Sequence, residues 1–268
     1  MTVLGASHET VRRLRRLARD ASERRREGAF VAEGPDAVVA ALDAGWPLEA
    51  VFVAESSLTH ERLAPVLERT GVIVITDAAL ERAADAQAPQ GVIAACRLPS
   101  RTLDEVDPSG LLLVLEDLQD PGNVGTLVRS AEAAGASGVV LVGEGVDPFH
   151  PKVVRASAGA IFRALTLKCS RDELLAWSSN HGVRSFATVL RGGMDPRHAP
   201  LHEPCAVWIG SEARGLSGET LAHLSDRVSI PMASSVESLN AAVAGSLLLF
   251  EGLYQRSHSS GGAPPPSL

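Results

Sequence analysis

Residues 111–129 read LLLVLEDLQDPGNVGTLVR, and this stretch decides the fold of the second half of the chain. The apolar run Leu111–Leu115 is typical of a strand that is buried on both faces of a sheet. Pro121 and Gly122 predict a turn after it, with Asn123 as the N-cap of a helix over about 124–134. Arg129 falls on that helix about one and a half turns later. The stretch therefore predicts a strand–loop–helix unit of an α/β protein.

Strands and helices alternate on both sides of this stretch. Downstream, strands are predicted over 139–142, 164–167, 185–189, 206–209 and 227–230, with a last helix from Ser238 to about Tyr254. Upstream, the predicted helices are 11–21, 37–42, 58–67 and 78–84, and the predicted strands are 30–32, 51–53, 72–75 and 91–96. The polar segment 99–110 is the best linker.

We therefore predict two domains of the α/β class. The first, over 1–105, is a small α/β sandwich. The second, over 110–256, is a mostly parallel sheet flanked by helices. A disordered tail is expected over 257–268, which is rich in Ser, Gly and Pro.

Composition excludes several classes of protein. Hydrophobic residues make up 45% and charged residues 21% of the 268 residues, which are values of a globular chain. No apolar run approaches the roughly 18 residues that span a bilayer, and no secretory signal precedes Arg12. The cysteines Cys96, Cys169 and Cys205 are odd in number and far apart, so we expect a reducing, cytoplasmic environment rather than a disulfide framework.

Charge is distributed unevenly along the chain. The net charge is −7, which by itself disfavours a nucleic-acid partner. Residues 9–27, however, hold eight arginines against four acids and are therefore +4, while the remainder is −11. A basic end on an acidic body can hold a phosphate backbone, although a solvated amphipathic helix explains the same pattern.

The common catalytic motifs are missing. The sequence contains no P-loop and no nucleophile elbow, and Gly143-Glu144-Gly145 lacks the third glycine of a dinucleotide fingerprint. The segment 202–205 (HEPC) differs from a zinc deaminase because His and Glu are adjacent and Trp208 stands where a second Cys is needed. The eight histidines show no metal-ligand spacing, so no metal is expected.

Three segments stand out, each directly after a predicted strand. They are 117–129, the glycine-bearing loop 210–215 (GSEARG), and Ile230-Pro231-Met232 followed by 238–242 (SLNAA). Alone, the first is a turn, the second a strand exit and the third a helix cap made by Ser238. The carboxyl ends of strands in one parallel sheet share an edge, and such edges bind ligands. We therefore expect the three segments to form one pocket.

These segments resemble the three motifs of the SpoU/TrmH family of RNA 2′-O-ribose methyltransferases, in the SPOUT superfamily. The first hundred residues resemble its small ribosomal-protein-like RNA-binding domain, most visibly at Glu33-Gly34. The resemblance implies a trefoil-knotted catalytic domain that binds S-adenosyl-L-methionine. It also implies a homodimer whose two subunits build the active site together.

The resemblance carries roles over to particular residues. Cofactor-binding residues would be Gly210, Ile230, Leu239, Met232, Thr188 and Leu190, and catalytic residues would be Asn123, Arg129, Glu212, Ser238 and Asn240. RNA phosphates would be held by Arg12, Arg13, Arg16, Arg19 and Arg155. The family assigns Arg129 as the general base, but a guanidinium has a pKa above 12 and no acceptor. We favour positioning and electrostatic stabilisation for Arg129 and leave the base open.

Large-subunit (23S) ribosomal RNA is the leading substrate, because the N-terminal domain type accompanies it. A tRNA 2′-O-methyltransferase is the alternative within the enzyme class, although the C-terminal tail lacks lysine. A resistance methyltransferase that acts on ribosomal RNA is not distinguished from a housekeeping one. A non-catalytic RNA-binding or ribosome assembly factor is the alternative outside the enzyme class, and the intact set of predicted catalytic residues argues against it.

Overall fold

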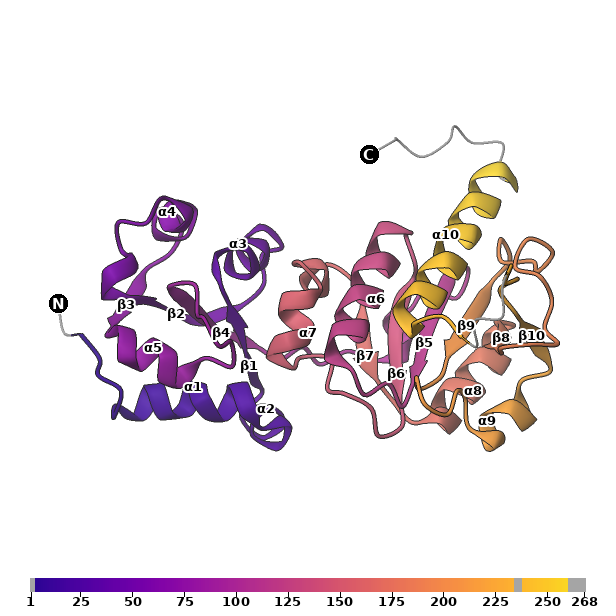
Figure 1. Ribbon diagram of the computed structural model, residues 1–268, viewed down its shortest axis with the longest axis horizontal. Helices are drawn as coiled ribbons and strands as arrows, with labels where there is room; N and C mark the ends of the chain where they lie inside the picture. The colour runs from indigo at the N-terminus through magenta and orange to yellow at the C-terminus, as the bar shows by residue number, and fades with distance from the viewer. Residues whose placement is uncertain (1–2, 234–237, 260–268) are drawn as a thin grey trace. The chain divides into compact units, whose positions relative to one another are not determined.

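The computed structural model describes residues 3–233 and 238–259. The chain divides into two compact units, which are drawn in Figure 1. Unit 1 comprises the chain up to Ser100 together with Asp147–Arg163. Unit 2 comprises Arg101–Val146 and the chain from Ala164 onward. None of the described helices combines the length and the apolarity that a membrane span requires.

Unit 1 is built on a four-stranded mixed sheet. Its strands are β1 (Ala29–Glu33), β2 (Leu48–Ala54), β3 (Val72–Ile75) and β4 (Val92–Arg97), in the order β1-β4-β2-β3. β4 is antiparallel to both neighbours, whereas β2 and β3 are parallel. Figure 1 shows α1 (Glu9–Arg19), α2 (Ala21–Glu27) and α5 (Asp77–Ala83) on one side of the sheet and α3 (Pro35–Asp43) and α4 (Ala64–Leu67) on the other. This small α/β domain agrees with the prediction.

Local chemistry sets the helix boundaries in unit 1. The predicted helix 11–21 ends at Arg19, because Asp20 is extended and its carboxylate accepts a hydrogen bond from Ser22 N at 2.7 Å, which starts α2. The predicted helix 58–67 is instead two 3-10 turns, η1 (Glu55–Ser57) and η2 (Glu61–Leu63), followed by the single turn α4. Pro65 stands in the first turn of α4 and lacks the N–H that a longer helix would need there.

The segment Asp147–Arg163 packs within unit 1 although it comes from the second half of the chain. It contains α7 (Pro151–Ala156) and the 3-10 turn η4 (Ala160–Phe162). The ring centroids of Phe149 and Phe162 lie 4.8 and 6.2 Å from that of Phe30. The predicted boundary between 105 and 110 follows chain order and leaves this segment in the other domain. Burial of its aromatic rings decides its place instead.

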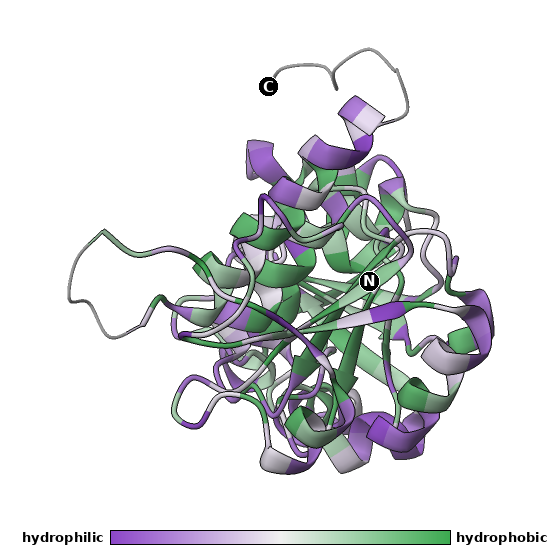
Figure 2. Ribbon diagram, turned by 90° about the vertical axis from the view of Figure 1, so that its right-hand side faces the viewer, coloured by the Kyte–Doolittle hydropathy of each residue, from purple (hydrophilic) through white to green (hydrophobic). Residues whose placement is uncertain are grey.

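Unit 2 contains a six-stranded sheet in which every pair of neighbours is parallel. The strands are β5 (Leu111–Glu116), β6 (Gly138–Val142), β7 (Thr166–Lys168), β8 (Arg184–Thr188), β9 (Cys205–Ile209) and β10 (Asp226–Val228). The order is β10-β8-β9-β5-β6-β7, so β5 is central and all six of its residues are buried. Figure 2 shows the strands in the middle of the view coloured as hydrophobic. The predicted parallel sheet is confirmed, and the trefoil knot stays a prediction.

Helices cover both faces of this sheet. Val114 and Trp208 share a core with Leu174 and Trp177 of α8 (Arg171–His181), and Leu224 follows α9 (Gly218–His223) into the same core. On the other face, α6 (Pro121–Ala133) packs against α10 (Ala241–Ser259). A Cβ at Gly245 would overlap the Leu127 side chain, so this glycine lets the two helices approach closely.

The ends of unit 2 differ slightly from expectation. The predicted linker contains a 3-10 turn, η3 (Leu103–Glu105), and Val106 joins the core. Helix α10 runs to Ser259, so the first three residues of the predicted tail are helical. The rest of that tail, 260–268, lies outside the described residues.

Candidate functional site

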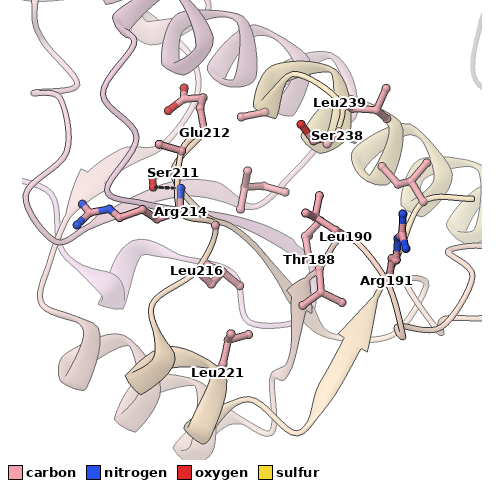
Figure 3. A pocket seen from close by; sticks show the side chains of 18 of the residues that line it. Thr188, Leu190, Arg191, Ser211, Glu212, Arg214, Leu216, Leu221, Ser238 and Leu239 are labelled. Carbon is pink, nitrogen blue, oxygen red and sulfur yellow. Dashed lines mark hydrogen bonds between the residues drawn. The ribbon is translucent and has the colours of Figure 1, made fainter. Parts of the chain in front are cut away.

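A pocket of about 640 Å³ lies at the carboxyl ends of β8 and β9 and beside the start of α10 (Figure 3). All six predicted cofactor-binding residues line it: Thr188, Leu190, Gly210, Ile230, Met232 and Leu239. Two predicted catalytic residues, Glu212 and Ser238, also line it. The second and third sequence motifs and the exit of β8 therefore converge on one pocket.

The glycine-bearing loop 210–215 doubles back on itself at this pocket. Ser211 N donates to Gly215 O at 3.1 Å, and Gly215 N donates to Ser211 O at 2.8 Å. A Cβ at Gly210 would overlap the backbone of Gly215 and Leu216. Glycine is therefore required at position 210 for the loop to close, and its backbone is left facing the pocket.

A buried carboxylate anchors the far end of this loop. Glu116, at the end of β5, is 4% exposed. It accepts hydrogen bonds from Ser217 N at 3.0 Å, Ser217 Oγ at 3.1 Å and Thr220 Oγ1 at 2.5 Å, and Arg171 Nη1 lies 3.7 Å away. Glu116 is not among the residues predicted from the sequence. The pattern that marks it is an acid at the end of an otherwise wholly apolar strand, next to the first motif.

Three predicted catalytic residues form a chain of hydrogen bonds. Asn123 Nδ2 donates to Glu212 Oε1 at 2.7 Å, and Asn240 Nδ2 donates to Asn123 Oδ1 at 3.0 Å. These residues come from the three separate motifs, so the chain links all of them. It also fixes the orientation of both amides, because each amide donates to an oxygen of the next residue.

The helix caps next to this chain are not those that the sequence predicted. Asp120, not Asn123, caps α6, since its carboxylate accepts from Gly122 N at 2.7 Å. Asn240, not Ser238, caps α10, since its Oδ1 accepts from Ala242 N at 2.9 Å and Val243 N at 3.2 Å. Asn123 therefore keeps its side chain free for Glu212, and Ser238 keeps its hydroxyl at the pocket.

Arg129 does not line this pocket among the residues that the structure describes. It is exposed on α6, one turn after Thr126. Thr126 lines a second, shallower groove of about 520 Å³ with Asn123, Asn240 and residues of α10. The structure thus brings Asn123, Glu212, Ser238 and Asn240 to one site and leaves Arg129 beside the α10 groove.

Thr188 has a buried hydroxyl with no hydrogen-bond partner in the described part of the chain. It lies at the end of β8 and lines the pocket, where Leu216, Leu221 and Ile209 supply apolar surface. An unsatisfied buried hydroxyl costs free energy unless a ligand supplies its partner. Together, these side chains suit a ligand that is largely apolar and carries a few polar groups.

The predicted RNA-binding arginines of α1 are mostly engaged with acids. Arg12 pairs with Glu9 at 3.0 Å, and Arg16 pairs with Glu9 at 3.1 Å and with Glu23 at 3.4 Å. Arg13 pairs with Glu27 at 2.5 Å and with Glu49 at 2.8 Å. Within residues 3–233 and 238–259, Arg19 makes no ion pair with an acid. The same is true of Arg15 and Arg25, which were not among the predicted RNA contacts.

Arg155 belongs to an internal network of unit 1. Its guanidinium pairs with Glu33 at 2.6 Å and with Asp85 at 2.9 Å. Glu33 is 6% exposed and also accepts hydrogen bonds from the backbone N–H groups of Asp85 and Ala86. Burial raises the pKa of this carboxyl, and the N–H group of Asp85 and the charge of Arg155 oppose that rise. Arg155 therefore helps to hold α7 on the unit, and its predicted RNA contact stays a prediction.

Neither a metal cluster nor a disulfide is found in the described residues. No three His, Cys, Asp or Glu side chains are grouped there in a way that would hold a metal ion. Cys96, Cys169 and Cys205 are free thiols. Burial raises the pKa of Cys169 to about 12 and that of Cys205 to about 11, so both are protonated at neutral pH.

Both parts of the chain match known protein families. Residues 110–250 match the model of the SpoU rRNA Methylase family, and residues 8–94 match that of the MRM3-like substrate binding domain. The 23S rRNA (uridine(2479)-2′-O)-methyltransferase of Streptomyces viridochromogenes is 31% identical, over 88% of this chain and 86% of its own. The 23S rRNA (guanosine(2553)-2′-O)-methyltransferase RlmP of Bacillus subtilis is 27% identical, over 85% and 90%.

Solved structures show the same similarity. The SpoU methyltransferase AviRb of Streptomyces viridochromogenes, in complex with the cofactor AdoMet, has a TM-score of 0.86 and 27% identity, over 96% of this chain and 100% of its own. An AdoMet-bound rRNA methyltransferase of Sinorhizobium meliloti has a TM-score of 0.80 and 30% identity, over 93% and 96%.

Proposed function

The chain belongs to the SpoU rRNA methylase family, and from that membership we propose that it is an S-adenosylmethionine-dependent 2′-O-ribose methyltransferase of 23S rRNA. The single observation that carries the proposal is the convergence of separate motifs on one pocket. Gly210, Ile230 and Leu239 line that pocket together, beside Glu212 and Ser238.

The pocket suits S-adenosylmethionine. Leucine and isoleucine side chains supply apolar walls, the Gly210 loop exposes backbone groups, and Thr188 offers a hydroxyl that has no partner within the described residues. Gly210, Ile230, Leu239, Met232, Thr188 and Leu190 would hold the cofactor. When bound, it supplies a methyl group already activated on a sulfonium sulfur.

The protein's own task is to align a ribose 2′-oxygen and to manage its proton. The Asn240–Asn123–Glu212 chain holds the Glu212 carboxylate in a defined orientation at the pocket. The Ser238 hydroxyl lies at the same pocket and can donate to or accept from the incoming ribose. Such alignment supplies much of the rate when the donor is already activated.

We assign Arg129 to positioning and electrostatic stabilisation. A guanidinium carries no acceptor and keeps its protons at neutral pH, so removing the ribose proton is a poor task for it. Its positive charge instead stabilises the alkoxide that develops on the 2′-oxygen. This role requires Arg129 to reach a cofactor pocket. Among the described residues, Arg129 does not line the pocket of its own chain.

A second copy of the chain would meet that requirement. Val243, Leu247, Phe250 and Tyr254 form an exposed apolar stripe on α10 and are 46–60% exposed. Part of this stripe lines the groove that also contains Asn123 and Asn240, and Arg129 lies beside it on α6. We therefore propose a homodimer in which the stripe is covered and each subunit offers its arginine to the other's pocket.

Ribosomal RNA is favoured over tRNA as the substrate. The match to the MRM3-like substrate binding domain covers residues 8–94, and the 23S rRNA methyltransferases cited above span 85–88% of this chain. The first two helices hold several arginines that are already paired with acids. We therefore propose that the phosphate contacts of these helices are Arg15, Arg19 and Arg25.

The proposed function is tested by calorimetry followed by mapping. We expect the purified protein to bind S-adenosylmethionine with one site per chain and to add one 2′-O-methyl group to an unmodified 23S rRNA transcript. A chain that binds RNA but not the cofactor would be a non-catalytic assembly factor. Methylation of tRNA but not of the 23S transcript would move the substrate to the alternative class.

A further inference from the structure

Two arginines lie on opposite sides of the pocket, as Figure 3 shows. Arg191 follows β8 and Arg214 stands in the glycine-bearing loop, and both line the pocket and are exposed. Throughout residues 3–233 and 238–259, neither guanidinium lies within ion-pair distance of an acid. Within the described residues, the pocket is thus flanked by two positive charges that make no ion pair.

Three other arginines of unit 2 are paired with acids. Arg171 pairs with Glu219 at 2.5 Å, Arg184 pairs with Asp226 at 2.8 Å, and Arg197 pairs with Asp195 at 2.5 Å. Although the net charge of the chain is −7, two arginines that make no ion pair within the described residues both line this one pocket. This arrangement points to an anionic ligand that approaches from outside.

The proposed reaction places two anions at this position. A ribose 2′-oxygen is bonded to the carbon next to the one that carries the 3′-phosphate, and the 5′-phosphate lies on the other side of the same sugar. Any ribose that presents its 2′-oxygen to the pocket therefore brings a phosphate along on each side. A guanidinium binds a phosphate through two parallel N–H donors, so an arginine on each side suits this arrangement.

We propose that Arg191 and Arg214 hold the phosphates that flank the target ribose, one on each side of the pocket. The inference rests on the proposed function and adds to it the contacts that seat the nucleotide. In Figure 3 the Arg214 side chain extends away from the other lining side chains. Two arginines on opposite sides also exceed what the single carboxylate of the cofactor requires.

The test compares R191Q, R214Q and the double variant with R227Q. Arg227 is a matched control, because it is exposed in β10 of the same unit and lies outside the pocket lining. We expect each pocket variant to raise KM for 23S rRNA while the Kd for S-adenosylmethionine stays unchanged. The slope of log KM against log salt should fall by about 0.7 for each phosphate that a variant no longer binds, as for single strands.

R191K and R214K keep the charge but not the paired donors, so they should recover the salt slope but only part of the affinity. Weaker cofactor binding with unchanged KM for RNA would overturn the proposal and assign the arginines to the cofactor's carboxylate. KM values no different from that of R227Q would overturn it as well. If the wild-type protein bound cofactor but methylated no RNA, the proposed function would fail first, and this inference with it.

Discussion

At the scale of single residues, the site depends on which polar group caps which helix. Asp120 caps α6 and Asn240 caps α10, and this leaves the Asn123 amide free to hold Glu212. Asn240 serves both purposes, since its Oδ1 caps the helix while its Nδ2 donates to Asn123. The start of each helix and the alignment of the proposed catalytic groups are therefore set by the same few hydrogen bonds.

Substitution of Arg129 by lysine tests its proposed role. R129K keeps the positive charge but removes the planar fork, so we expect most of the methyltransferase activity to disappear while cofactor affinity changes little. Single-turnover rates on 23S rRNA and calorimetry with S-adenosylmethionine measure the two quantities. Turnover like that of the wild type would remove Arg129 from the mechanism.

Glu116 is expected to act on cofactor binding without touching the cofactor. E116Q removes the carboxylate charge that accepts hydrogen bonds from Ser217 and Thr220 and lies near Arg171. Loss of a hydrogen bond to a buried charge costs about 1.5–3 kcal/mol of stability. Because those donors follow the loop that carries Gly210, we expect the Kd for S-adenosylmethionine to rise about tenfold or more.

The matched control for E116Q is E33Q, which alters a buried glutamate of unit 1. E33Q should leave the Kd for S-adenosylmethionine unchanged. E116D, which keeps the charge, should restore part of the affinity. Equal cofactor affinity in E116Q and the wild type would show that the loop is held without Glu116.

At the scale of elements, α7 shows how a short helix is placed by what surrounds it. Phe149 precedes it and packs against Phe30, while Arg155 within it pairs with Glu33 and Asp85. Asp147 pairs with Arg24, whose side chain is almost fully buried, at 2.7 Å. Removing either partner of such a buried pair is strongly destabilising, so this segment is held by both packing and charge.

The cap of α7 makes the stability of unit 1 depend on pH. His150 Nδ1 accepts from Lys152 N at 3.1 Å, which requires a neutral ring. Burial lowers the pKa of His150 below its usual 6.5, with Asp85 opposing that shift, so the folded state binds the proton less tightly than the unfolded state. Stability from this cap is therefore complete above the ordinary pKa and is lost as the pH falls below it.

H150N supplies a cap that does not titrate. We expect the wild type to lose more stability than H150N between pH 7.5 and pH 5.5, measured as urea midpoints. Titration of the His150 ring by NMR measures the pKa directly. An identical loss of stability in both proteins would assign the acid sensitivity to other groups.

At the scale of the whole molecule, the exposed apolar stripe of α10 departs from an ordinary surface. Exposed apolar residues in one row along a helix are typical of an interface. The proposed dimer accounts for the stripe and for the position of Arg129 at once, because part of the stripe lines the α6–α10 groove and Arg129 follows the groove residue Thr126 by one turn. It also makes activity a property of pairs of chains.

Mixing two inactive variants tests this sharing. R129A lacks the arginine, and G210V disrupts the loop that lines the pocket because a Cβ at Gly210 overlaps the backbone of Gly215 and Leu216. Each homodimer should be inactive, but half of the dimers in an equal, re-equilibrated mixture are mixed, and each has one intact site. We therefore expect about a quarter of the wild-type activity to return. No recovery in a mixture shown by mass spectrometry to contain mixed dimers would place Arg129 in the pocket of its own chain.

The sequence by itself determined most of the elements and the composition of the pocket. The strands of unit 2 are short apolar runs, the motifs follow them directly, and parallel strands must bring those motifs to one edge. All six predicted cofactor-binding residues line the pocket for that reason. These features depend on neighbours in the chain or on the direction of strands, which local patterns reveal.

Only the tertiary structure decided which side chains are already engaged. Glu212 meets Asn123 across 89 positions, Arg155 meets Glu33 across 122, and Asp147 meets Arg24 across 123. The tertiary structure also decided that Arg12, Arg13 and Arg16 form ion pairs with acids. It likewise decided that Arg191 and Arg214 form none within the described residues. A charge is free or paired according to what the folded chain brings within a few ångströms of it, and no local pattern records that distance.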